Sequence, residues 1–264
     1  MYMLDELTGW HDAWWAGLAG HLRAAGLTDV PERLSHPADP RDIWTSPDLL
    51  FAQTCGYPYT HDVAGHLRLI ATPRYGAPGC DGADYTSTIA VRADSHLHTL
   101  DDLIDRTVAA NGPDSFSGYW ALLDAMTDVR QGRPPFRRCV FTGHHAASLD
   151  AVATGAADVC AVDSVTWALL AAHRPHAMER FRVLARTRPT PGLPYVTAGH
   201  RDDDTVARLR RGLFDALADP ELAAARAALL LDGAQVLTDD AYAGIPRLVR
   251  AARDACRSLA LASA

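Results

Sequence analysis

Apolar residues near the start of the chain recur with the spacing of a helix. They lie four positions apart, on one face of that helix, at Trp10, Trp14, Leu18 and Leu22. The pattern predicts a helix over residues 5–26, followed by a Pro- and Asp-rich loop over residues 29–41. Apolar and β-branched runs bounded by turn residues then predict three strands, over residues 49–54, 67–72 and 85–92.

From residue 107 onward, short apolar strands alternate with helical segments. Three strand–helix pairs are predicted, over residues 107–111 with 117–129, 138–142 with 146–154, and 157–162 with 164–172. Such alternation is typical of a parallel sheet with helices on its faces. The rest of the chain predicts strands over 181–188 and 195–198 and is otherwise mostly helical, over 203–231 and from 239 to the end.

The sequence changes character on both sides of this α/β block, at residues 92–99 and 188–194. Two such crossings predict an α/β protein of two lobes joined by two hinge strands, with a ligand cleft between them. The second lobe, residues 93–193, is then inserted into a first lobe made of residues 1–92 and 194–264. A single doubly wound sheet with long surface loops fits the same pattern equally well.

Composition narrows the chemistry. All 25 basic residues are Arg, so mechanisms that need a lysine base, a Schiff-base lysine or a P-loop lysine are excluded. The net charge is −7 without a basic patch, so nucleic acid is not an expected partner. No apolar run reaches the roughly 18 residues of a transmembrane helix, so membrane insertion is not expected either. Cofactor-binding glycine motifs are absent from the sequence, and no cofactor is expected.

The start of the chain and its cysteines bear on its location and its redox state. Residues 1–6 lack the basic and apolar regions of a secretory signal, so the chain as written is expected in the cytoplasm. If a signal has been removed, the periplasm or the extracellular space is expected instead. The five cysteines are odd in number and lack metal-binding spacing, so neither a disulfide framework nor a metal site is expected. A pair between Cys55 and Cys80 stays open.

The strongest chemical pattern lies where the strand over 107–111 gives way to a helix. Small polar residues occupy this start, and Ser115, Ser117, Gly118 and Tyr119 are the candidate ligand contacts. The first backbone N–H groups of a helix have no acceptor within the helix, and they lie at the positive end of its dipole. The pattern therefore predicts a site for a phosphate, phosphonate or carboxylate group. An ordinary serine N-cap would give the same pattern.

The next two strands end in polar residues as well. His144 and His145 follow the strand over 138–142, and Asp163 ends the strand over 157–162. Carboxyl ends of parallel strands meet at one edge of an open sheet, which is where such sheets bind ligands. The three residues are therefore candidates for the same ligand site as the serines, although capping or solvated histidines and a capping aspartate are the plain alternatives.

A fourth group lies earlier in the chain. Its candidate ligand contacts would face the cleft from the other side, and they are Thr54, Cys55, Tyr57, Tyr85, Thr86 and Ser87. Cys55 would be a nucleophile if a base lay beside it. Free cysteine is more often a packed small residue, and Cys55 is also the candidate partner of Cys80.

Taken together, these motifs resemble the phosphate, phosphite and phosphonate type of ABC-transporter substrate-binding proteins. The resemblance runs from about residue 49 to residue 197. The matching stretches follow one another in the order of that family, at residues 53–58, 72–80, 85–87, 91–92, 115–119, 143–149 and 155–164.

This resemblance implies a type II periplasmic-binding-protein fold with two α/β lobes. It implies that Ser115, Ser117 and Gly118 hold the phosphonate oxygens and that His144 assists them. It also implies that Tyr85 contacts the ligand from the first lobe and that Asp163 receives an amine of the ligand.

The function predicted from all of this is capture of a small oxyanion-bearing solute, phosphonate- or phosphate-like, in an interlobe cleft for ABC-type uptake. The expected partners are the small anion and an ABC permease. The alternative is a cytoplasmic enzyme on the same fold that acts on a small anionic metabolite with Cys55, His144, His145 and Asp163 as its catalytic residues. A sensor or partner-binding lobe is a third, weaker alternative.

Overall fold

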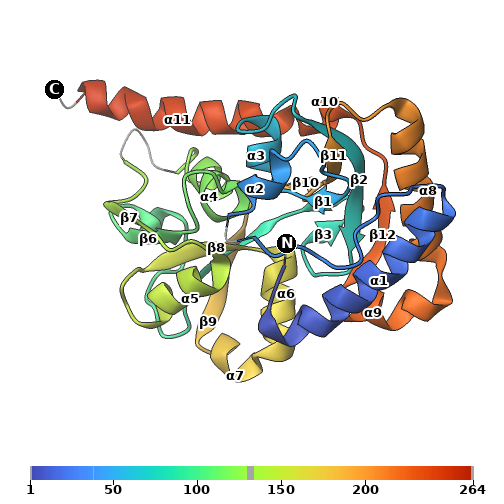
Figure 1. The fold of residues 1–264 in the computed structure, drawn as a ribbon. Coiled ribbons are helices and arrows are strands. Elements are labelled where there is room, and N and C mark those ends of the chain that lie inside the picture. Colours follow the sequence, from blue (N-terminus) through green and yellow to red (C-terminus); the bar gives the residue numbers. More distant parts are fainter. Residues whose placement is uncertain (1, 38, 130–133, 263–264) are drawn as a thin grey trace. The chain divides into compact units, whose positions relative to one another are not determined.

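The chain folds into two compact units, each assembled from separate stretches of sequence (Figure 1). The computed structural model describes residues 2–37, 39–129 and 134–262, with side chains described up to residue 254. Unit 1 comprises residues 1–76, 81–84 and 191–242. Unit 2 comprises residues 77–80, 85–190 and 243–264. The chain therefore passes from one unit to the other after residues 76, 80, 84, 190 and 242.

Unit 1 is built on an antiparallel sheet of four strands in the order β1-β11-β2-β12. Their bounds are Ala52–Gln53 (β1), Tyr195–Ala198 (β11), Leu67–Tyr75 (β2) and Leu231–Gln235 (β12). The long helices α1 (Thr8–Ala24) and α8 (Asp203–Ala218) pack against each other, and α9 (Ala223–Ala228) contacts both α1 and β12. Shorter helices complete the unit: η1 (Asp5–Leu7), α2 (Arg41–Trp44), α3 (Gly56–Thr60), η4 (Pro220–Leu222) and α10 (Asp239–Tyr242).

Helix α1 follows directly from the apolar spacing of its sequence. Trp14, Leu18 and Leu22 are buried, as predicted, and Trp15 is buried beside them. Trp10 is the exception, because it remains 40% exposed one turn before Trp14. Helices α1 and α8 approach closely at Gly212, where an added Cβ would lie 2.8 Å from Leu22 Cδ2 and 2.9 Å from its Cα.

Unit 2 is built on a mixed sheet of five strands in the order β7-β6-β8-β5-β9. Their bounds are Arg138–Phe141 (β7), Thr107–Ala110 (β6), Val159–Asp163 (β8), Ser87–Arg92 (β5) and Phe181–Arg186 (β9). Strands β7, β6 and β8 are parallel, whereas β5 runs antiparallel to both β8 and β9. The helices of the unit are η2 (Asp101–Leu103), η3 (Phe116–Trp120), α4 (Ala121–Ala125), α5 (His145–Ala153), α6 (Ser164–His173), α7 (Pro175–Met178) and α11 (Gly244–Ala262).

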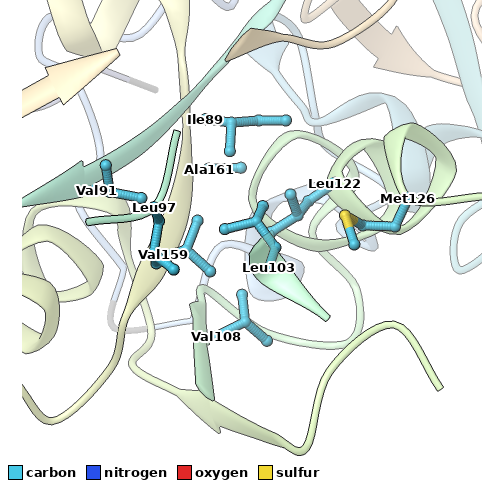
Figure 2. Packing of buried hydrophobic residues seen from close by; sticks show 9 residues of the cluster. All are labelled: Ile89, Val91, Leu97, Leu103, Val108, Leu122, Met126, Val159 and Ala161. Atoms are coloured by element: carbon cyan, nitrogen blue, oxygen red, sulfur yellow. The ribbon is translucent and has the colours of Figure 1, made fainter. Parts of the chain in front are cut away.

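The core of unit 2 positions the helical segment formed by η3 and α4. Alternate residues of a strand point to one face of the sheet, and on β5 and β8 those residues include Ile89, Val91, Val159 and Ala161. Leu122 and Met126, one helical turn apart, pack against them from α4 and the turn that follows it (Figure 2). Since all of these side chains are buried, η3, which leads directly into α4, is held at the end of strand β6.

Three two-residue strands form a third sheet in the order β10-β4-β3. They are Thr190–Pro191 (β10), Asp84–Tyr85 (β4) and Cys80–Asp81 (β3). Each of them contains a point at which the chain passes from one unit to the other.

The division into units differs from the predicted lobe boundaries over residues 77–80, 85–92, 191–193 and 243–264. Residues 85–92 belong to unit 2 rather than to the first lobe, because β5 pairs along its whole length with β8 and β9. Residues 243–264 also belong to unit 2, because α11 packs on α4 and η3. The chain also passes between the units five times, rather than through the two hinge strands of the prediction.

Three predicted elements differ from those observed. The strand expected over 49–54 pairs only at residues 52–53, and the helix expected over 117–129 has π-helical bonding at its start and ends at residue 125. The helical prediction for the C-terminal region left β12 undetected.

Candidate functional site

The carboxyl end of strand β6 leads into the predicted anion site. Ser115 is the N-cap of η3, and its Oγ accepts a hydrogen bond from the Gly118 N–H at 3.1 Å. This cap uses the hydroxyl oxygen as an acceptor, so its hydrogen stays available for donation. Ser115 therefore has the capping role that the sequence left as an alternative. The cap satisfies the Gly118 N–H, whereas the other N–H groups of the first turn have no acceptor inside the helix.

Gly118 has no room for a side chain. A Cβ at this position would lie 2.7 Å from Asn111 Cγ and Oδ1 and 3.0 Å from Ser115 Oγ. Asn111 follows β6, and its carbonyl accepts the Gly143 N–H at 2.8 Å. The close approach of η3 to Asn111 therefore ties the helix start to the residues that follow β7.

Ser117 meets His145 and Asp163 in one connected group. His145 Nε2 lies 3.2 Å from Ser117 Oγ and 3.1 Å from Asp163 Oδ2. Its Nδ1 lies 3.1 Å from the Ala161 carbonyl oxygen. Ser117 is 5% exposed, and the side chains of His145 and Asp163 are 12% and 4% exposed. The sequence prediction placed these three residues at one sheet edge, and they do come together.

The hydrogen bonds of this group fix one ring nitrogen of His145. The Ala161 carbonyl oxygen can only accept, so Nδ1 donates to it, while Nε2 faces both the Ser117 hydroxyl and the Asp163 carboxylate. Burial alone raises the pKa of Asp163, but the hydrogen bond and charge of His145 and the two hydrogen bonds from Thr166 outweigh it and leave that pKa below its ordinary value. The group is therefore a buried histidine between a serine hydroxyl and a carboxylate.

Asp163 has little capacity left for a ligand. It is the N-cap of α6, and its Oδ1 accepts the Thr166 N–H at 2.8 Å. Its Oδ2 accepts the Thr166 hydroxyl at 2.5 Å in addition to His145. The carboxylate thus holds the start of α6 and the ring of His145.

His144 and Tyr119 flank this group. The exposed His144 is the N-cap of α5, and its Nδ1 accepts the Ala147 N–H at 3.2 Å. Tyr119 is in edge contact with Phe141, which ends β7 and is 51% exposed. His144 therefore has the capping role that the sequence left as an alternative, and His145 is the histidine in contact with the serine.

Residues 85–87 lie in the same unit as the serines. Tyr85 is only 3% exposed and Ser87 is 2% exposed. Ser87 lies opposite Asp163 in the β5–β8 pair, and its N–H donates to Thr187 Oγ1 at 2.8 Å. Residue 85 is the first residue of this stretch of unit 2, and contact of Tyr85 with a ligand remains a prediction.

The other predicted contacts lie in unit 1. Thr54 is fully buried, and Cys55 is a free thiol that precedes α3. Tyr57 stacks on His61 with ring centroids 4.1 Å apart. Their contact with a ligand remains a prediction.

Thiol and metal chemistry receive no support from the described residues. Cys55, Cys80, Cys139 and Cys160 are free, so the pair considered between Cys55 and Cys80 is not formed. Burial, and secondarily the charge of Asp163, raises the pKa of the Cys80 thiol to about 11, which keeps it protonated at neutral pH. Within the described chain, three or more potential metal ligands gather nowhere.

Residues 46–242 match the protein family described as the periplasmic substrate-binding protein of the phosphonate ABC transporter. The chain belongs to this family. No curated protein matches it in a sequence search. Of the helices in the described residues, none is long and apolar enough to cross a membrane.

Solved structures of phosphonate-binding proteins and their relatives share the fold. A binding-protein component of a phosphonate ABC transporter from Pseudomonas aeruginosa is 21% identical, with a TM-score of 0.73 over 92% of this chain and 82% of that one. PhnD1 from Prochlorococcus marinus, in complex with methylphosphonate, is 13% identical, with a TM-score of 0.68 over 93% and 92%. XAC2383 from Xanthomonas citri, bound to ATP, is 19% identical, with a TM-score of 0.71 over 96% and 95%. The predicted type II periplasmic-binding-protein fold is thereby confirmed.

In this member of the family, polar residues that were not among the predicted ligand contacts also shape the sheet edge. Ser148 Oγ lies 2.6 Å from Thr142 Oγ1 and 3.4 Å from Asn111 Oδ1, which joins the ends of β6 and β7 to α5. Arg186, at the end of β9, donates to Ser164 and Thr88. Asn111 follows a buried strand directly, so its position was a usable signal, whereas the partners of Arg186 are distant in sequence.

Proposed function

We propose that this protein captures a small phosphonate, or a closely related oxyanion such as phosphate or phosphite, on unit 2 and delivers it to an ABC permease in the periplasm. The family to which the chain belongs is a periplasmic substrate-binding family. Its relative PhnD1 binds methylphosphonate. The protein's own ligand and its permease are the proposed part.

One observation carries the proposal: the hydroxyls of Ser115 and Ser117 stand together at the start of η3, where Ser115 caps the helix and Ser117 contacts His145. Ser117 contacts Nε2 of His145, which also faces the buried Asp163 carboxylate. An anion there would receive hydroxyl and backbone N–H donors together with the positive end of the helix dipole. Charge-assisted hydrogen bonds of this kind are about twice as strong as neutral ones.

Titration calorimetry with methylphosphonate, phosphate, phosphite, sulfate and acetate tests the proposal. We expect saturable 1:1 binding of at least one phosphorus oxyanion and weaker binding of acetate. Ser117→Ala should weaken that binding by about tenfold or more, the usual cost of a hydrogen bond to a charged group.

Thr154→Ala is the matched control, because Thr154 is an exposed hydroxyl at the far end of α5. Its affinity should equal that of the unaltered protein. If no phosphorus oxyanion binds, or if both variants lose affinity equally, oxyanion capture at this helix start is wrong.

The predicted contacts in unit 1 are tested in the same assay. Tyr57→Phe removes one hydroxyl that stands outside unit 2. A loss of affinity in this variant would extend the site to Tyr57, whereas unchanged affinity would confine the polar contacts to unit 2.

A further inference from the structure

Arg186 is held at the end of β9 by hydroxyl groups rather than by a carboxylate. Its Nη1 donates to Thr88 Oγ1 at 3.2 Å and to Ser164 Oγ at 3.1 Å. Those two bonds use both hydrogens of Nη1, so the Nε and Nη2 donors lie outside them. In the described part of the chain, the charge of this exposed guanidinium has no acidic partner.

The residue before β3, Gly79, packs closely against this guanidinium. Gly79 has a φ of +103°, and a Cβ there would lie 2.3 Å from Arg186 Nη1, 2.4 Å from Ser164 Oγ and 2.7 Å from Thr86 Oγ1. Thr86 donates its hydroxyl to the Gly79 carbonyl at 3.0 Å, and Ser164 donates its own to the Thr86 carbonyl at 2.8 Å. The hydroxyl hydrogens are thus directed into the backbone, and the Ser164 oxygen remains an acceptor for Arg186.

Arg186 also lies at the ligand-binding edge of the sheet. Strands β8 and β9 both run antiparallel to β5 and therefore in the same direction as each other. Arg186 ends β9 as Asp163 ends β8, next to Ser164 at the start of α6. Cys80 lies close enough to both charged groups for Asp163 to raise the pKa of its thiol and for Arg186 to lower it, so the two ends are near in space.

The hydrogen bonds of Asp163 argue against an amine-binding pocket at this edge of the sheet. Its carboxylate is buried and already accepts hydrogen bonds from the Thr166 N–H, the Thr166 hydroxyl and His145. An ammonium group on a ligand would have to break one of these bonds to reach it. Asp163 is thus occupied by its own neighbours, whereas the positive charge of Arg186 at this edge has only hydroxyl partners among the described residues.

We propose that Arg186 forms a second anion subsite on unit 2 and that the preferred ligand carries two acidic groups, a phosphonate and a second anionic group such as a carboxylate. This inference rests on the proposed function, because the first acidic group is the one held at Ser115 and Ser117. The second group would accept from the guanidinium Nε and Nη2, as planar carboxylates do from arginine.

Calorimetry at constant ionic strength with three probes tests this subsite: methylphosphonate, phosphonoacetate and 2-aminoethylphosphonate. We expect phosphonoacetate to bind about tenfold or more tightly than the other two, which corresponds to about 1.4 kcal/mol or more. In Arg186→Gln this preference should fall to within about twofold, while the methylphosphonate affinity stays within about twofold of the original.

Arg92→Gln is the matched control. It removes the same charge from the same sheet at the opposite edge, where Arg92 ends β5 and pairs with Asp94. It should leave all three affinities unchanged.

The outcomes separate the two proposals. Methylphosphonate binding without a preference for phosphonoacetate, or an Arg186→Gln effect that is equal for all three probes, would overturn the second subsite and leave the proposed function standing. The same holds for an equal effect of Arg92→Gln. Failure of all phosphonates and of phosphate to bind would overturn the proposed function itself.

Discussion

Gly118 is the residue on which the anion site depends most directly. Its missing side chain lets η3 lie against the Asn111 side chain, so any larger residue must displace either that side chain or the Ser115 cap. We expect Gly118→Ala to lower the free energy of unfolding by about 1–3 kcal/mol, the usual cost of overpacking, and to abolish methylphosphonate binding.

Chemical denaturation and calorimetry measure both effects, and Ser115→Ala is the comparison. That variant loses only the cap, which is worth about 1 kcal/mol, and should keep weakened binding. If Gly118→Ala binds as tightly as the original protein, the close approach to Asn111 is unimportant for the site.

Asp163 makes the stability of the folded protein depend on pH. Its pKa is below its ordinary value in the folded protein, so the folded state binds this proton less readily than the unfolded state does. The resulting stability is therefore present above the unfolded pKa of about 3.9 and is lost as the pH falls through the folded value. Asp163→Asn should cost about 3 kcal/mol at pH 7, because it leaves a buried charge without its partner.

Urea unfolding at pH 7, 5 and 3 checks this expectation. The difference between Asp163→Asn and the original protein should shrink as the pH falls toward the folded pKa of Asp163, because protonation then removes the charge that the asparagine lacks. Asp202→Asn alters a similar but exposed N-cap and should have a smaller effect at every pH. A gap for Asp163→Asn that stays constant from pH 7 to pH 3 would contradict the assigned ion pair.

The residues of the proposed first anion site were readable from sequence because each lies at the end of a strand or in the turn or helix start that follows one. Ser117, His145 and Asp163 are such cases. Arg186 was not readable, since its partners Thr88 and Ser164 lie 98 and 22 residues away. The choice between His144 and His145 also required coordinates, because only the turn geometry decides which of two adjacent rings faces the serine.

At the scale of elements, the packing of α1 on α8 depends on small residues. Gly212→Ala would place a Cβ against the side chain and backbone of Leu22, and backbone cannot move aside as a flexible side chain can. We expect a loss of about 1–3 kcal/mol in the free energy of unfolding.

Gly20→Ala in α1 is the matched control, because its Cβ would meet no atom within 4 Å. Replacing an exposed helical glycine stabilises the helix, so this variant should gain about 0.5–1 kcal/mol. Thermal and urea unfolding of the two variants should therefore differ in sign, and equal effects would show that the helix contact is loose.

Prediction of elements succeeded where the pattern was local. The three strand–helix pairs from residue 107 onward correspond to β6, β7 and β8 with the helices that follow them. The position of β5 between β8 and β9 depends on pairing with segments at least 68 residues away, which no periodicity reveals. Strand β12 was missed because Leu231–Gln235 is short and contains Asp and Gly, which strands disfavour.

At the scale of the whole molecule, neither unit is continuous in sequence, and unit 2 needs the last part of the chain. Helix α11 packs on α4 and η3, and Arg253 lies 5.3 Å from the centre of the Trp120 ring. We expect a chain that ends at residue 243 to lose methylphosphonate binding, because the helical segment that presents Ser115 and Ser117 then loses its support.

Calorimetry on the shortened chain tests this expectation. Arg253→Gln is the control, because it removes a single cation–π contact worth about 0.5–1 kcal/mol at an exposed position and should keep the affinity within about twofold. Undiminished binding by the shortened chain would show that η3 and α4 hold their place without α11.

The late position of α11 in the chain has a consequence for biosynthesis. A ribosome releases residues in order, at roughly 5–20 per second, and the strands of the binding unit emerge well before the helix that supports its anion-binding turn. That turn stays incompletely packed until α11 has been made as well. Under the proposed function, the protein acquires its ability to hold the solute only after α11 has joined the unit, and a chain terminated before α11 would be unable to take part in uptake.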